Sequence, residues 1–202
     1  MLVFLKVILF VVSILQAGVS HANNLDKVTQ ALEKAKLKEA HSLIAFSQFS
    51  EPHSEKLKTA LDQLGIPPEQ VLLVRVPLMP AAGFKTIYLG SDFVREIPLD
   101  VLRFVLAHEL GHVVLKHSHQ KVAFIVNNFP EEASSVEDSI HKVPTPINHK
   151  IEYEADTFAK NMLIRLGYYD PTLPAKTFMF LAGFSQTTRT HPSNFDRIDA
   201  LK

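Results

Sequence analysis

The sequence predicts a mostly helical α+β fold, and three observations support this prediction. Several segments place apolar residues at the three- and four-residue spacing of an amphipathic helix. Two short runs, 71–76 (VLLVRV) and 86–89 (TIYL), are typical of neighbouring strands. The chain has 202 residues, of which 47% are hydrophobic, and this suffices for one globular domain with a substantial core.

The N-terminal segment 1–22 has the layout of a cleavable export signal. Lys6 precedes an apolar run that is shorter than the about 20 residues of a membrane-spanning helix. Small residues, Ser20 and Ala22, occupy the third-last and last positions before the expected cleavage site. We therefore expect a single mature domain at 23–202 that has no membrane segment and is exported, to the bacterial periplasm. The alternative is an uncleaved anchor.

Helical patterns recur along the rest of the chain. They cover 25–35, 54–64, 99–117, 150–166, a segment after Pro174, and a last segment that starts at Asn194 as its N-cap. Gly65 and Gly167 follow two of these helices and provide stops. Between the two strands lies a turn-rich link, and 127–149, with acids, serines and three prolines, is expected to be a loop or a flexible cover.

Composition excludes several classes of partner and site. Lys+Arg and Asp+Glu both number 21, so charge gives no reason to expect nucleic acid or an anionic membrane surface as a partner. The chain has no cysteine, which excludes disulfides and thiolate metal sites. A zinc centre in this protein would therefore use histidines and carboxylates.

The segment HELGH contains two histidines four residues apart, His108 and His112. On a helix these positions share one face at about 6 Å, so both imidazoles can converge on one metal ion. Glu109 lies beside that face and can act on water as a general base. The motif lies in an apolar helical run, where polar side chains are costly unless they bind something. His117 and His119, further along, are predicted to be surface or packing residues.

A catalytic zinc site needs a third protein ligand and an open position. Glu152 and Asp156 are four residues apart in the next long helix, so one carboxylate can bind the metal and the other can orient a ligand histidine. Glu154 points elsewhere and is expected to be a solvated charge. His141 and His149 compete as third ligands, but both belong to the predicted loop.

The C-terminal segment THPSNFDRI offers a third polar element. His191, whose backbone is stiffened by Pro192, could donate a hydrogen bond to a developing oxyanion. Arg197, one turn into the last helix, could support it. Taken alone, His191 could equally be a surface residue.

Three ordered motifs, VLAHELGHVVLKHS, EYEAD and THPSNFDRIDAL, resemble those of the HtpX-like and Oma-type zinc metallopeptidases. This gluzincin group, metallopeptidase family forty-eight, resembles the chain over about 71–202. The resemblance implies one Zn²⁺ held by His108, His112 and Glu152, with Glu109 as the catalytic acid/base. It implies that Asp156 orients a ligand, that His191 and Arg197 line the cleft, and that a small sheet lies beside the HExxH helix.

The resemblance also implies polypeptide substrates, bound in extended form by strand addition to the edge of that sheet. It implies envelope protein quality control, with envelope proteins as possible partners. The stretch MPAAGFKT departs from the family pattern before the edge strand, which leaves the substrate contacts there open.

Two alternatives share the same ligands. One is a zinc-stabilised chaperone or binding module that does not cut its clients and has no need of Glu109. The other is a latent protease whose open metal position is covered by the 127–149 loop. The sequence does not give the natural substrate, the cleavage preference, the oligomeric state or the regulation.

Overall fold

The computed structural model describes residues 43–44, 51–74, 80–129, 140–182 and 190–202. The predicted signal segment and the helix predicted over 25–35 lie outside these residues. The chain divides into two compact units, one of Met1–His41 with Lys116–Pro144 and one of Ser42–Leu115 with Thr145–Lys202. The second unit contains the three ligands implied by the family resemblance, the proposed base Glu109, and the supporting residues Asp156, His191 and Arg197, whereas the competing ligand His141 belongs to the first unit.

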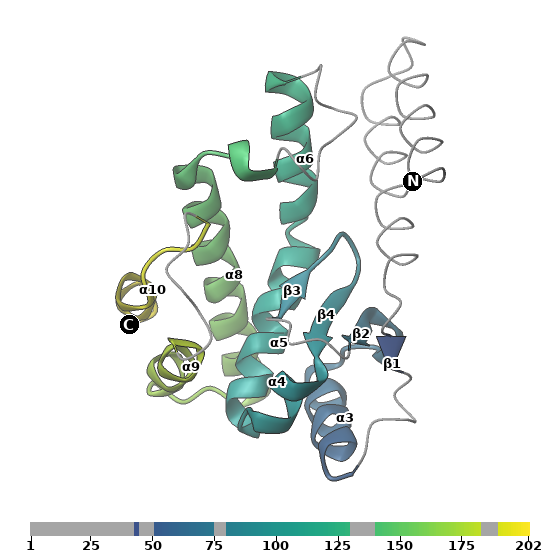
Figure 1. Cartoon of the computed structure of the whole chain (residues 1–202). Coiled ribbons are helices and arrows are strands. Elements are labelled where there is room, and N and C mark those ends of the chain that lie inside the picture. Colours follow the sequence, from purple (N-terminus) through teal and green to yellow (C-terminus); the bar gives the residue numbers. More distant parts are fainter. Residues whose placement is uncertain (1–42, 45–50, 75–79, 130–139, 183–189) are drawn as a thin grey trace. The chain divides into compact units, whose positions relative to one another are not determined.

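A small sheet of four short strands belongs to the second unit (Figure 1). The strand order is β1 (Leu43–Ile44), β2 (Val71–Val74), β4 (Ile87–Gly90) and β3 (Ala81–Ala82). β2 and β4 are parallel neighbours, which confirms the two strands predicted from the sequence. β3 pairs antiparallel with β4 inside the predicted turn-rich link. Two residues are too few for a periodic pattern, so the sequence could not indicate this strand.

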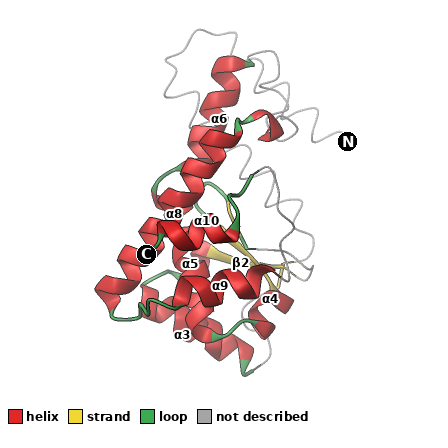
Figure 2. Ribbon diagram, turned by 90° about the vertical axis from the view of Figure 1, so that its left-hand side faces the viewer, coloured by secondary structure: helices red, strands yellow, loops and turns green. Residues whose placement is uncertain are grey.

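Six helices complete the described part of this unit. They are α3 (His53–Leu64), α4 (Ser91–Glu96), α5 (Leu99–Val114), α8 (Thr145–Leu166), α9 (Leu173–Ala182) and α10 (Asn194–Ala200), with a 3-10 turn at Pro68–Gln70. α5 runs between the sheet on one side and α8 and α9 on the other (Figure 1). Seen from the helical side, the strands lie behind the helices (Figure 2).

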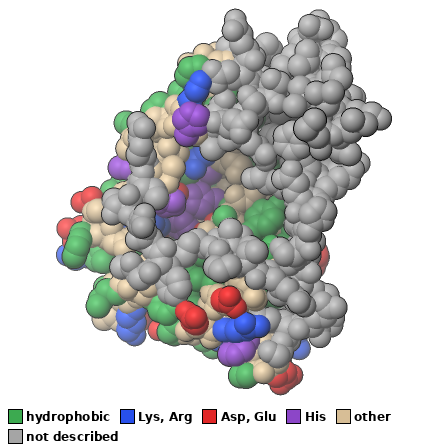
Figure 3. Space-filling model, in the orientation of Figure 1, with side chains coloured by type: hydrophobic (Ala, Val, Ile, Leu, Met, Phe, Trp, Pro, Cys, Tyr) green, Lys and Arg blue, Asp and Glu red, His purple; other side chains and the backbone are tan. Residues whose placement is uncertain are grey.

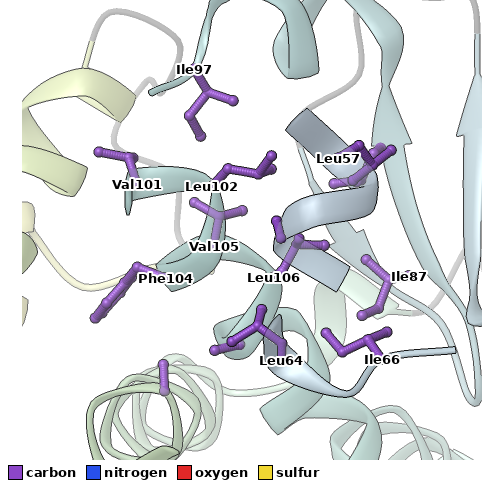
Figure 4. Packing of buried hydrophobic residues seen from close by; sticks show 14 of the residues in the cluster. Leu57, Leu64, Ile66, Ile87, Ile97, Val101, Leu102, Phe104, Val105 and Leu106 are labelled. Carbon is purple, nitrogen blue, oxygen red and sulfur yellow. The ribbon is translucent and has the colours of Figure 1, made fainter. Parts of the chain in front are cut away.

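The N-terminal half of α5 supplies the centre of the hydrophobic core. Leu102 and Leu106 are fully buried, and their neighbours on α5 are nearly so. Figure 4 shows them beside side chains of α3, β4 and the link after α3, namely Leu57, Leu64, Ile66 and Ile87. Burial of a leucine contributes about 1.5–3 kcal/mol relative to exposure, so packing on all sides holds α5 in the middle of the unit.

The helix predicted over 99–117 is wrong at its C-terminal end. α5 ends at Val114, and Lys116 adopts a φ of 58°, in the left-handed region where a right-handed helix cannot continue. α6 (His117–Asn128) starts after this break. The residues from Lys116 to Lys121 are polar and include neither glycine nor proline, so no helix-breaking residue marks the break.

The predicted loop 127–149 is also shorter than expected. α6 continues to Asn128, and α8 starts at Thr145 and not near Lys150. Pro146 contributed to the loop prediction. Proline nevertheless fits the first turn of a helix, because the N–H groups of that turn have no acceptor within the helix. A 3-10 turn at Ile140–Lys142 precedes α8, and 130–139 lie outside the described residues.

α10 starts where the sequence predicted a helix, but its cap is different. Ser193 is the N-cap, and its hydroxyl accepts the backbone N–H of Asp196 at 3.1 Å. Asn194 was predicted for this role; its side chain instead donates to the carbonyl of Phe178 at 3.1 Å. This bond ties the start of α10 to α9.

In the first unit, α6 and the turn at Ile140–Lys142 pack on each other. His117 is buried, and the Lys142 ammonium lies 5.1 Å from the ring centre of Phe129. Across the described residues of both units, none of the helices combines the length and apolar character needed to cross a membrane.

Candidate metal centre

Two histidines of α5 face each other one helical turn apart. The Nε2 atoms of His108 and His112 are 3.0 Å apart, and their rings meet edge to face. The i, i+4 spacing places both on the face of α5 that packs against α8. The pair therefore presents two imidazole nitrogens to one point, as the spacing in the sequence predicts.

Glu152 of α8 supplies a carboxylate at the same point. Its Oε2 lies 3.5 Å from His108 Nε2, and its Oε1 lies 3.5 Å from His112 Nε2. The ligand atoms of the three residues all lie within 4.8 Å of one another. Only 3% of Glu152 is exposed, so the carboxylate is held in the interior.

Gly111 explains how α5 and α8 come close enough for this arrangement. A Cβ at this position would lie 3.2 Å from the Cα of Ala155 and 3.2 Å from the side chain of Phe158. Small residues on both helices, Gly111 and the fully buried Ala155, let the two backbones approach. The close approach gives the short glutamate side chain access to both histidines.

Behind the three-residue cluster, Asp156 orients the first histidine. Its Oδ1 lies 2.9 Å from His108 Nδ1, and the carboxylate is almost fully buried. A carboxylate only accepts hydrogen bonds, so Nδ1 donates to Asp156, and Nε2 is the nitrogen that faces the cluster and can bind a metal ion once it has lost its own proton.

Arg197 of α10 holds Asp156 in turn. Its Nε and one terminal nitrogen donate to the two Asp156 oxygens at 2.8 and 2.7 Å, a bidentate pair. The same nitrogen lies 3.6 Å from Glu152 Oε2, and the guanidinium lies 4.4 Å from the ring centre of Phe178. Arg197 is buried, so the structure places it behind the ligands as their support.

The charges of the cluster stabilise one another. Burial by itself would lower the pKa of His108, but the hydrogen bond to Asp156 and the nearby Glu152 carboxylate raise the pKa to about 10. Burial would raise the pKa of Glu152, yet the nearby His108 and the other histidines of the cluster hold it well below its usual range. Burial would also raise the pKa of Asp156, but the hydrogen bonds from Arg197 and His108 lower it below its ordinary value. Both carboxylates are therefore ionised at neutral pH.

His191 lies at the exposed rim of the cluster. Its Nε2 is 3.6 Å from Glu152 Oε2, its Nδ1 is 2.9 Å from the Thr190 hydroxyl, and 53% of its side chain is exposed. Glu109, the proposed base, is buried at 7% exposure next to His108. Figure 3 shows histidine side chains gathered in a hollow on this face of the molecule, beside hydrophobic side chains.

The cluster fits a zinc ion by the chemistry of its donor atoms. Glu152 Oε2 is buried and, among the described residues, finds no hydrogen-bond partner, although such atoms are costly to leave unsatisfied. Two imidazoles and one carboxylate, with no thiolate, form a ligand set that zinc hydrolases use. The second carboxylate on a ligand histidine is the support that such sites carry.

Residues 53–202 match Peptidase family M48. The chain belongs to this family of zinc metallopeptidases. The match starts at α3, whereas the resemblance predicted from the motifs covers only about 71–202. Searches of the curated proteins and of the solved structures found no significant match to this chain.

The other candidate ligands lie outside the metal centre. Within the described ranges, the group of His108, His112 and Glu152 contains none of the remaining histidines or acids named above, which are His117, His119, His141, His149 and Glu154. His119 was predicted further along the helix of His112, but it lies in α6, because the helix breaks at Lys116. Glu154 lies 3.7 Å from Lys150 on the outer side of α8.

Sequence reasoning missed two residues that contact the site. Phe178 lies under the Arg197 guanidinium and meets Phe104 edge to face at 6.1 Å. Thr190 contacts the ring of His191. An apolar residue in an apolar helix and a threonine in a turn carry no distinctive pattern, so only their contacts reveal them.

Proposed function

We propose that this protein is an exported zinc endopeptidase that cleaves unfolded or extended polypeptide segments of envelope proteins. The observation that carries the proposal is the convergence of His108, His112 and Glu152 within 4.8 Å, with Glu109 adjacent in the sequence. Membership of the M48 family supports peptide hydrolysis as the reaction.

His108, His112 and Glu152 would hold the ion. When bound, zinc would supply Lewis-acid chemistry that polarises the scissile carbonyl and lowers the pKa of a water molecule. Glu109 takes a proton from the attacking water and delivers it to the leaving amine. Its burial supports this role, because the carboxylate is shielded from bulk water and can therefore pass the proton to the substrate and not to the solvent.

The remaining polar residues have separate roles in this mechanism. His191 lies on the exposed side of Glu152 and donates a hydrogen bond to the oxyanion of the tetrahedral intermediate. Asp156 holds the ring of His108, and Arg197 holds Asp156. Arg197 thus acts through Asp156 and contributes no direct contact to the substrate.

The sheet supports extended substrates. β3 is at the end of the strand order, so its outer edge is unpaired by the described strands. An extended peptide can add to such an edge through backbone hydrogen bonds, which a folded domain cannot offer. Ala81 and Ala82 are small, which leaves the edge accessible to different substrate side chains.

The deciding experiment compares zinc-loaded wild-type protein with Glu109→Gln on unfolded casein. We expect Glu109→Gln to keep its zinc and to lose hydrolysis by about 10²–10⁴-fold, because the general base is gone. His112→Ala is the matched control and should lose the metal as well. Equal turnover by wild type and Glu109→Gln, or no turnover by either when zinc is bound, would favour a non-cutting binding module.

Export is tested separately. The layout of segment 1–22 supports it, since a short apolar run followed by small residues is typical of cleaved signals. We expect the mature protein in the periplasmic fraction to begin at Asn23, as read by N-terminal sequencing. A protein that retains Met1 in the membrane fraction would support the anchor instead.

A further inference from the structure

We infer that Thr190 is a positioning residue that holds the ring of His191 with its proton on Nε2. The inference rests on the oxyanion role of His191 in the proposed function. It adds a residue whose own side chain need not touch the substrate.

The two ring nitrogens of His191 have different partners. Nδ1 lies 2.9 Å from the hydroxyl oxygen of Thr190, which is a hydrogen-bond distance. Nε2 lies on the other side, 3.6 Å from Oε2 of Glu152. The ring thus lies between a hydroxyl and the metal cluster.

The oxyanion role decides which nitrogen must carry the proton. Nε2 is the nitrogen that faces the metal cluster, and only a nitrogen that bears hydrogen can donate to an oxyanion there. Nδ1 of the neutral ring then carries a lone pair. A threonine hydroxyl can turn its hydrogen toward that lone pair, and Thr190 therefore donates to Nδ1.

This hydrogen bond matters because the His191 ring is half exposed. Water alone can hydrogen-bond either tautomer, so solvent does not select one. Stabilisation of an oxyanion needs an N–H donor that already points at the site before the reaction. Thr190 supplies the selection, and the buried Pro192 anchors the backbone on the other side of His191.

The tautomer can be read without any enzyme assay. Nitrogen-15 NMR of histidine-labelled protein separates protonated from unprotonated ring nitrogens. The chain has 10 histidines, so His191→Gln identifies the His191 signals by their loss. We expect Nε2–H in the wild type and in Thr190→Ser, which keeps the hydroxyl. Thr190→Val has the same shape without the hydroxyl and should give a mixture of tautomers.

Kinetics on zinc-loaded protein provide the second test. We expect Thr190→Val to lower kcat about tenfold with KM little changed, a fraction of the about 10²–10³-fold cost of losing an oxyanion donor altogether. Thr190→Ser should restore most of the rate. Thr172→Val removes another hydroxyl that bonds to a neighbouring side chain, that of Asp170 in the turn before α9, and should leave kcat unchanged.

A double-mutant cycle shows whether Thr190 acts through His191. In the His191→Ala background, Thr190→Val should cause no further loss, because there is no ring left to orient. An equal loss in both backgrounds would overturn the inference, and so would an Nδ1–H tautomer in the wild type. If zinc-loaded wild type cuts no peptide, the proposed function fails, whereas the NMR result still decides the hydrogen bond.

Discussion

The two halves of α5 are buried to a similar degree, but different interactions hold them. From Val101 to Ala107 the buried side chains are apolar and contact α3, the sheet and α9. From His108 to His112 the helix places two histidines and a glutamate in the interior, at 7–9% exposure. The first half is stable through burial itself, whereas the second half depends on the carboxylates and the arginine that face it.

This difference separates stability from chemistry along one helix. Apolar packing is non-directional, so other side chains of the right size would serve in the first half. Buried charges need specific partners, since removal of one partner leaves another charge unpaired. Mutations in the two halves should therefore produce different combinations of unfolding energy and metal affinity.

The largest effect is expected from Asp156→Ala. It leaves Arg197 buried without its bidentate partner, so the free energy of unfolding should fall by about 3–5 kcal/mol. Zinc affinity should also fall about 10–100-fold, because His108 loses the group that orients it. Urea unfolding and competitive zinc titration measure the two effects.

The control for this variant is Asp199→Ala, on the same helix as Arg197 but on its exposed side. It should change the free energy of unfolding by no more than about 0.5 kcal/mol and leave zinc affinity unchanged. A similar loss of stability and zinc affinity in both variants would contradict the role of Asp156 as the partner of Arg197 and His108.

Leu102→Ala tests the apolar half. Leu102 is fully buried, so its truncation should lower the free energy of unfolding by about 2–5 kcal/mol through lost burial and the cavity left behind. Zinc affinity of the folded protein should stay within about twofold of wild type, since the ligands keep their partners. If affinity fell as far as in Asp156→Ala, the two halves of α5 would not be separable.

Gly111→Ala tests the contact between α5 and α8. The added methyl group lies 3.2 Å from Ala155 and from Phe158, so the helices must shift slightly apart. We expect a loss of about 1 kcal/mol in unfolding and about tenfold in zinc affinity, because Glu152 moves away from the histidines. Gly65→Ala, strained by a φ of 64° but remote from α8, should cost stability and spare zinc binding. Unchanged affinity in Gly111→Ala would show that the site tolerates the wider spacing.

A change of pH, without any substitution, tests the charged half of α5, because the pH dependence should differ between metal-free and zinc-loaded protein. Without metal, His108 has a folded pKa of about 10 against 6.5 unfolded, so its stabilisation is complete below pH 6.5 and is lost as pH rises through 10. Glu152 and Asp156 have lower pKa values in the folded than in the unfolded protein. Their stabilisation is therefore complete above pH 4.5 for Glu152 and above pH 3.8 for Asp156, and it is lost as the pH falls further.

Zinc must displace the His108 proton, so its apparent affinity should rise up to about tenfold per pH unit between pH 6.5 and 10. Calorimetry in buffers of different ionisation enthalpy should detect about one proton released at neutral pH. Zinc binding without proton release would contradict the protonated state of His108. The gap in stability between loaded and metal-free protein should widen toward alkaline pH.

Local spacing accounts for what could be predicted from the sequence. His108 and His112 are four residues apart on one helix, and so are Glu152 and Asp156, hence each pair shares a face wherever the helix lies. The strands at β2 and β4 and the starts of α3, α5 and α9 also follow from local pattern. The break at Lys116 and the short strand β3 have no such pattern, and the prediction missed both.

The sequence by itself determined the donor atoms of the metal centre, because residue type and helical period are local properties. Tertiary structure alone decided that α8 lies against α5 at Gly111, that Arg197 pairs with Asp156 41 residues away in sequence, and that Thr190 and Phe178 support the site. These contacts depend on how several helices pack together, and packing depends on the shapes of all the side chains between them.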